Sequence, residues 1–270
     1  MKHDMLIGIN IHNSGYTPYT NTLEENLDAA AGMGMNIIRC NNCSNTPEAL
    51  AEIRRVADGC HARGMKLMLC MDHSLWFRRN NEPLAEIEAF YEAHMEKTAA
   101  ALGGAVDIYQ IFNETDVACM GGDIQHIVKE RQDGLDAGEY DSVMFDGAIA
   151  GMRGSLRGLK RGYPAAVTCV NFAWWHTALL YAMHDAGFRF DVIGLDWYSD
   201  AEEVSDIALV VADVCRHIPD SDLMICETNY WMNLHPRWDE NQRAAVMNEA
   251  TRDAGQAEWV PSFVKKCRRS

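Results

Sequence analysis

Two glutamates, Glu114 and Glu227, follow apolar stretches that are typical of buried strands. The first stands near the end of IYQIFNET (residues 108–115), and the second ends DLMICE (residues 222–227). Two carboxylates that face one another across a cleft can hydrolyse a glycosidic bond, because one protonates the leaving oxygen while the other attacks the anomeric carbon or activates water. The two groups need different pKa values, so their surroundings are expected to differ. We therefore take these glutamates as the candidate catalytic pair.

Other polar and aromatic residues stand where further apolar runs stop, and we expect eight of them to bind substrate: Arg39, His73, Asn113, Asn171, Asp196, Trp197, Tyr198 and Trp231. A cation at Arg39 would keep one carboxylate ionised, and the Tyr198 hydroxyl would donate a hydrogen bond to the same group. Asp196 is either a further acid of the site or a partner for Arg39. Aromatic rings stack on the C–H faces of sugars, so the tryptophans that follow strand ends favour an open groove for an oligosaccharide: Trp76, Trp174, Trp175, Trp197 and Trp231.

The elements that must position these residues alternate between short apolar runs and amphipathic segments. The expected strands are 5–11, 35–40, 65–71, 106–112, 165–172, 190–196 and 222–227. The expected helices are 22–33, 47–64, 83–102, 141–161, 176–186, 201–217 and 239–254. Thr22 and Glu25 have the spacing of a capping box, and Pro47 follows a threonine as the first residue of a helix. Residues 115–140 are expected to be irregular.

Seven strand–helix units whose strands are uniformly apolar predict a parallel sheet buried on both faces. We interpret the chain as a single-domain (β/α)8 TIM barrel over residues 1–270, with a doubly wound sheet as the alternative. No glycine-rich phosphate loop follows the first strand, which disfavours that alternative. The eighth unit is expected to be incomplete or atypical, because residues 259–264 are the candidate for its strand, Pro261 interrupts them, and nothing remains for an eighth helix. Either this tail supplies the last strand, or the barrel is open, or the C-terminus is altered from its ancestral form.

The composition narrows the range of partners. The chain has 270 residues and a formal net charge of −15, so it repels nucleic-acid phosphates and anionic lipids. No apolar run approaches the length of a membrane span. We therefore expect a carbohydrate partner, and neither nucleic acid nor membrane.

The nine cysteines lie mostly inside apolar runs, and their odd number indicates reduced thiols. Cys40 and Cys43 form a CxxC pair, but no second pair follows, so a zinc site is not expected. The free thiols and the absence of a visible signal peptide favour the cytoplasm, whereas removal of a signal would make the protein secreted.

The combination of Asn-Glu after the fourth strand and Glu after the seventh resembles the clan of retaining (β/α)8 glycoside hydrolases, which includes β-mannanases, cellulases and β-1,4-galactanases. The likeness covers residues 5–231. It implies that Glu114 is the acid/base, that Glu227 is the nucleophile, and that Asn113 binds the sugar 2-hydroxyl.

The resemblance extends to three other positions. Arg39 matches the arginine that follows the second strand in the clan, and His73 in MDHSLW is similar to its third-strand histidine motif. Tyr198 in FDVIGLDWYS occupies the position that orients the nucleophile. The chain departs from the clan at Asp196, where many members carry histidine, and at the eighth-strand tryptophan, for which Trp259 is the one candidate.

The sequence therefore predicts a retaining β-glycoside hydrolase that cleaves a β-linked poly- or oligosaccharide by double displacement, without a metal or organic cofactor. Two alternatives remain open. One is a catalytically impaired barrel that binds carbohydrate. The other is a metal-dependent barrel hydrolase or isomerase, a class that often has His-x-His after its first strand, where INIHNS contains only His12.

Overall fold

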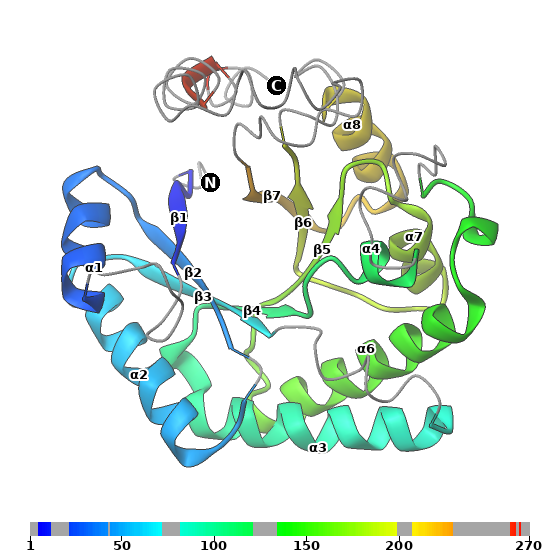
Figure 1. Cartoon of the computed structure of the whole chain (residues 1–270), viewed down its shortest axis with the longest axis horizontal. Coiled ribbons are helices and arrows are strands. Elements are labelled where there is room, and N and C mark those ends of the chain that lie inside the picture. The colour runs from blue at the N-terminus through cyan, green and yellow to red at the C-terminus, as the bar shows by residue number, and fades with distance from the viewer. Residues whose placement is uncertain are drawn as a thin grey trace, which may run out of the picture. The chain divides into compact units, whose positions relative to one another are not determined.

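The computed structural model describes residues 5–11, 22–42, 44–71, 82–120, 134–198, 207–228, 260–262 and 265. Its strands form one seven-stranded sheet in the order β1-β2-β3-β4-β5-β6-β7 (Figure 1). The strand pairs with a described register are parallel. Strands alternate with helices along the chain, so the predicted fold class, a (β/α)8 barrel with an incomplete or atypical eighth unit, is confirmed.

The strands are β1 (Gly8–Ile11), β2 (Ile37–Asn41), β3 (Lys66–Met71), β4 (Ile108–Ile111), β5 (Thr168–Ala173), β6 (Val192–Asp196) and β7 (Asp222–Glu227). The α-helices are α1 (Leu23–Gly32), α2 (Pro47–His61), α3 (Leu84–Leu102), α4 (Thr115–Cys119), α6 (Ser142–Gly162), α7 (Ala178–Asp185) and α8 (Ile207–His217). Two short 3-10 helices, η2 (Gly103–Ala105) and η3 (Ala137–Glu139), complete the described elements. Each of these strands lies within or next to a predicted run, and the boundaries differ by a few residues.

The chain divides into two compact units, one made of residues 1–113 and 143–170 and the other of residues 114–142 and 171–270. The boundary falls between Asn113 and Glu114, and β5 begins in the first unit and ends in the second. Organisation as a single domain stays a prediction.

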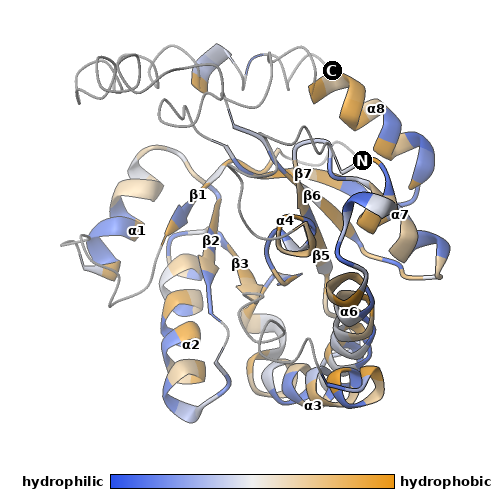
Figure 2. Cartoon of the chain, turned by 45° about the vertical axis from the view of Figure 1, so that its right-hand side comes forward, coloured by the Kyte–Doolittle hydropathy of each residue, from blue (hydrophilic) through white to orange (hydrophobic). Residues whose placement is uncertain are grey.

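In the first unit, α1, α2, α3 and α6 lie outside β1 to β4 (Figure 1). Strands β2, β3 and β4 form the buried centre of this unit, whereas β1 is largely exposed, and the helices carry hydrophilic as well as hydrophobic residues (Figure 2). All four residues of β4 are buried, and Leu67 and Leu69 of β3 are completely inaccessible. Burying such side chains stabilises the fold by roughly 1.5–3 kcal/mol each.

Helices α3 and α6 pack unusually closely, and this contact explains the many glycines of α6. A Cβ atom at Gly154, Gly158 or Gly162 would lie 2.1–2.3 Å from a backbone carbonyl oxygen of α3. The glycines recur every fourth residue, so they line one face of α6 and admit the backbone of α3. Helix α6 forms despite the low helix propensity of glycine because tertiary packing outweighs it.

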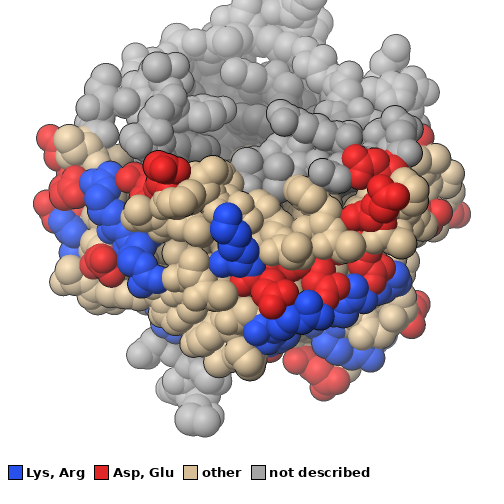
Figure 3. Space-filling view, turned by 90° about the horizontal axis from the view of Figure 1, so that it is seen from below, with Lys and Arg blue, Asp and Glu red and all other residues tan. Residues whose placement is uncertain are grey.

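Charged side chains flank the same helix contact. Arginines of α6 pair with glutamates of α3 in a ladder along the two helices: Arg153 with Glu88, Arg157 with Glu88 and Glu92, and Arg161 with Glu92 and Glu96. Acidic and basic side chains alternate over this face in Figure 3. The pairs are exposed on their arginine side, so each contributes modestly to stability.

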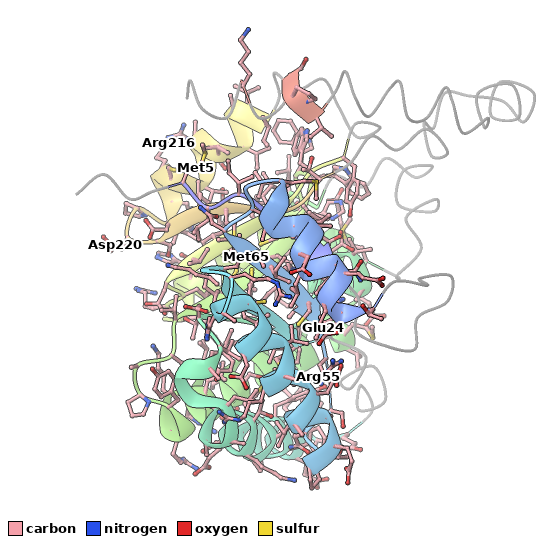
Figure 4. All side chains as sticks on the ribbon, turned by 90° about the vertical axis from the view of Figure 1, so that its left-hand side faces the viewer. Met5, Glu24, Arg55, Met65, Arg216 and Asp220 are labelled. Atoms are coloured by element: carbon pink, nitrogen blue, oxygen red, sulfur yellow. The ribbon has the colours of Figure 1, made fainter. Side chains whose placement is uncertain are left out.

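The first two helices begin as predicted. Thr22 and Glu25 form the capping box of α1, and the Thr46 hydroxyl caps α2 just before Pro47. Arg55 of α2 also pairs with Glu24 of α1 at 3.1 Å, and Figure 4 shows these two side chains side by side.

The second unit contains the end of β5, the strands β6 and β7, and helices α4, α7 and α8. Residues 115–140 were expected to be irregular, but Thr115–Cys119 form α4 and Ala137–Glu139 form η3. Helix α4 has only five residues, so its hydrophobic periodicity cannot be recognised in the sequence.

The candidate for an eighth strand, residues 259–264, is not extended where the structure describes it. Val260–Ser262 are helical rather than extended (Figure 1). Proline at position 261 fits this conformation, because its φ angle suits the first turn of a helix. The predicted helix 239–254 lies outside the described residues.

Candidate active site

The backbone of Glu114 is held in place by two consecutive hydrogen bonds that involve buried side chains. The Glu114 amide donates to Oδ1 of Asn171 over 3.1 Å. The Asn171 side chain in turn donates to Oδ2 of Asp196 over 2.5 Å. Asn171 is the fourth residue of β5 and Asp196 the last of β6, so two strands determine where Glu114 begins α4. Glu114 itself is partly exposed, whereas Asn171 and Asp196 are buried.

Near these strand ends the backbone of three residues adopts the left-handed conformation, which residues with a side chain rarely occupy. Within the described residues, the non-glycine residues with positive φ are Phe112, Glu114 and Trp174, with φ of 58°, 42° and 46°. A left-handed conformation at a non-glycine residue costs of order 1–3 kcal/mol and persists only where its surroundings enforce it. Phe112 directly follows β4, Trp174 directly follows β5, and Glu114 stands three residues after β4, so the strain is found just beyond the ends of these strands.

Tyr198 is hydrogen-bonded to one of the two candidate catalytic glutamates, Glu227. Its hydroxyl donates to Oε2 of Glu227 over 2.6 Å. Burial raises the pKa of Tyr198, and the negative charges of Glu227, Asp196 and Glu114 raise it further. The phenol therefore stays protonated and can donate to Glu227 at any neutral pH.

A β-bulge places Glu227 at the end of β7. Leu195 pairs with Ile225, but Asp196 pairs with Glu227, so one extra residue is inserted in β7. Bulges of this kind redirect a side chain at the end of a strand. Gly194 makes the arrangement possible, because a Cβ atom there would lie 2.5 Å from the Cys226 sulfur and 2.9 Å from Cβ of Asn171.

A second network lies at the corresponding strand ends of the first unit. Arg39, 5% exposed, donates from Nε to Oε1 of Gln110 over 2.8 Å and from Nη2 to Oδ1 of Asn113 over 2.6 Å. The Gln110 amide also donates to Oδ1 of Asn113, over 3.2 Å. The predicted residues Arg39 and Asn113 thus contact each other. Arg39 holds the side-chain carboxamide of Asn113, the residue that precedes Glu114.

Three buried residues near these strand ends were not predicted as site residues. Gln110 interrupts an otherwise apolar strand, a signal that the sequence offered. Asp116 and His176 form a buried pair just beyond Glu114, with Nδ1 of His176 2.8 Å from Oδ2 of Asp116. The same carboxylate oxygen accepts the Ala173 amide over 3.0 Å. Sixty positions separate the two side chains in the sequence, so no local pattern indicates the pair.

The tryptophans differ from the expectation of an open aromatic groove. Trp197 is completely buried, and its ring meets that of Trp175 edge to face at 6.1 Å. Trp174 is also buried, next to His176, whereas Trp175 is partly exposed. Trp197 therefore packs against Trp175 with no exposed ring face in this structure, and its assignment to substrate binding stays a prediction.

Several predicted positions lie outside the described residues. These are the substrate-binding candidates His73 and Trp231, and also His12, Cys43, Trp76 and Trp259. The described cysteines are free thiols, and among them Cys215 alone is exposed. No helix in the described part of the chain has the length and apolar character that a bilayer crossing requires.

Solved structures with a similar fold include β-glycosidases. The family 1 β-glucosidase from Thermotoga maritima superimposes with a TM-score of 0.61 over 87% of this chain and 81% of its own, at 13% sequence identity. The hyperthermophilic β-glucosidase from Pyrococcus furiosus gives 0.60 over 88% and 72%, at 13% identity. The β-glycosidase BGL167 gives 0.59 over 89% and 73%, at 15% identity. No known protein-family profile and no curated protein sequence matches the chain. At these identities the similarity establishes the fold alone.

Proposed function

We propose that this protein is a retaining β-glycoside hydrolase that acts on a β-linked oligo- or polysaccharide through Glu114 and Glu227. The observation that carries the proposal is the hydrogen bond that the Tyr198 hydroxyl donates to Glu227 at the end of β7, with Glu114 standing directly before α4. Two carboxylates that flank a glycosidic bond at the ends of barrel strands can hydrolyse that bond. The shared fold with β-glycosidases supports the same assignment.

In the first step, Oε1 of Glu227 attacks the anomeric carbon while the bond from that carbon to the leaving oxygen breaks. Glu114 gives its proton to the leaving oxygen. Tyr198 holds the Glu227 carboxylate through Oε2 and so orients it for the attack. The product of this step is a glycosyl ester on Glu227.

In the second step, Glu114 removes a proton from water, and the water oxygen attacks the anomeric carbon. The ester bond to Glu227 breaks, and the sugar is released with net retention. A separation of about 5–5.5 Å between the two carboxyl groups is expected for this mechanism. The buried Asn171–Asp196 pair holds the backbone of Glu114 and so directs the acid towards the leaving oxygen.

The test uses substitution of each glutamate and an aryl β-glycoside panel, with β-glucoside first because the similar structures include β-glucosidases. Mannan, galactan, cellulose and xylan complete the panel. We expect Glu227→Ala to abolish turnover. Azide should rescue Glu114→Ala on an activated aryl glycoside and yield a glycosyl azide of unchanged anomeric configuration.

Glu52→Ala is the matched control, because Glu52 lies on the outer helix α2. It should retain wild-type turnover. Wild-type-like hydrolysis by Glu227→Ala would contradict the assignment. Sugar affinity without hydrolysis across the whole panel would point instead to a carbohydrate-binding barrel.

A further inference from the structure

Three metal-ligating side chains gather on the outside of the second unit, at the ends of two helices. His184 and Asp185 are the last residues of α7, and His217 is the last residue of α8. One ligand atom from each of the three lies within 4.8 Å of the other two. The cluster is partly exposed and belongs to neither network at the strand ends.

The distances within the cluster match the edges of a tetrahedral metal centre. Oδ1 of Asp185 lies 3.4 Å from Nδ1 of His184 and 3.2 Å from Nε2 of His217. In a tetrahedron with metal–ligand bonds of about 2.0–2.1 Å, neighbouring ligand atoms are roughly 3.3 Å apart. If a cation replaced the protons of these two hydrogen bonds, the Asp185–His184 and Asp185–His217 distances would already match the ligand–ligand distances of a tetrahedral site.

Two further features of the cluster favour the binding of a cation. Both helices end at it, and helix C-termini favour positive charge because their last carbonyl groups have no intrahelical partner. The ring of Tyr181 also stacks on that of His217, with centroids 3.9 Å apart and planes 10° apart. The Tyr181 hydroxyl is itself held by Asp213 at 2.7 Å. This support restrains the imidazole plane before any metal binds, as outer contacts of metal ligands commonly do.

We propose that His184, Asp185 and His217 form a zinc site that joins α7 to α8, with water as the fourth ligand. Two imidazoles and one carboxylate suit Zn²⁺, which prefers nitrogen ligands with at most a few oxygens. Both imidazoles bind as neutral rings and Asp185 as an anion, so the bound centre has a net charge of +1. Its ligands stand at the C-terminal ends of two helices, whereas the proposed catalytic pair follows β4 and ends β7, and its function is to join two neighbouring strand–helix units.

The experiment measures zinc binding in a Cys215→Ser background, which removes the exposed thiol among the described cysteines. Chelator-treated protein is titrated with ZnCl2 by calorimetry, and thermal unfolding is followed with and without zinc. We expect one equivalent to bind and Tm to rise by a few degrees, because a ligand that binds only the folded state stabilises it. Co²⁺ should give the visible absorption of a tetrahedral centre.

Two site variants and one control complete the test. His217→Ala and Asp185→Asn should each weaken zinc binding at least tenfold and remove the rise in Tm. Both changes are at partly exposed positions, and circular dichroism would verify folding. The control is His61→Ala, because His61 forms a similar exposed pair with Asp107, but no third ligand completes a cluster there among the described residues. Unchanged zinc affinity in His217→Ala, or no saturable binding in the background protein, would overturn the proposal.

Discussion

Nδ1 of His176 lies 2.8 Å from Oδ2 of Asp116, and the two side chains are only 3% and 2% exposed. Asp116 belongs to the helix that starts after Glu114, and His176 follows β5. The pair thus ties together the two chain segments that carry the left-handed residues Glu114 and Trp174.

We predict that His176→Phe lowers the free energy of unfolding by about 3–5 kcal/mol, because it leaves the buried Asp116 carboxylate without its partner. Asp116→Asn keeps the shape and should cost less, about 1–3 kcal/mol. Urea unfolding followed by circular dichroism measures both. His61→Ala, which breaks an exposed pair, should change stability by no more than about 1 kcal/mol. Equal losses in the buried and exposed variants would contradict this interpretation.

The Tyr198–Glu227 hydrogen bond should contribute to catalysis. A hydrogen bond to a charged group is worth about 1.5–3 kcal/mol, so Tyr198→Phe should lower kcat/KM by roughly 10- to 100-fold on an aryl β-glycoside. The matched control is Tyr181→Phe, which loses a similar phenol–carboxylate bond of 2.7 Å to Asp213 on the helical exterior. Full activity in Tyr198→Phe would remove Tyr198 from the mechanism.

The close contact of α3 and α6 predicts a large effect of a single methyl group. Gly158→Ala would place Cβ 2.2 Å from the carbonyl oxygen of Glu92. The helices must separate to admit it, which should cost about 1–3 kcal/mol or more and lower Tm. Gly32→Ala is the control, because that Cβ meets no atom within 4 Å and alanine is the better helix former. Equal Tm values for the two variants would argue against this packing.

Stability should decrease in alkaline solution because of buried thiols. Burial raises the pKa of Cys40 from 9.0 to about 12 and that of Cys60 from 9.0 to about 11. Above pH 9 the unfolded chain loses these protons while the folded chain keeps them. The stabilisation is therefore complete below pH 9 and is lost as the pH rises towards 11–12, by up to about 1.4 kcal/mol per pH unit for each thiol.

Urea unfolding at intervals from pH 8 to pH 10.5 measures this slope. Cys40→Ala should unfold more easily at pH 7 but show a shallower decline with pH. Cys215→Ser changes an exposed thiol and should keep the wild-type slope. A decline in Cys40→Ala as steep as that of the wild type would assign the effect to other groups.

Much of the fold could be predicted from local patterns. Apolar runs bounded by caps and glycines indicated all seven described strands, and β7 matches its predicted range of 222–227. Thr22 and Glu25 indicated where α1 begins because a capping box depends on residues only three positions apart. The polar residues at strand ends were recognisable for the same reason, since an apolar run that stops at Asn113-Glu114 is visible in the sequence alone.

The tertiary structure decided which of these residues meet. The bulge that sets Glu227 opposite Asp196, the left-handed turn at Glu114 and the buried Asp116–His176 pair all depend on strands far apart in the chain. The burial of Trp197 likewise depends on Trp175 of another strand end. Local periodicity records which face of an element is apolar, but it carries no information about the neighbour that covers that face. Hydrogen-bond partners and exposure are therefore properties of the packed chain, whereas the elements themselves follow from residue types only a few positions apart.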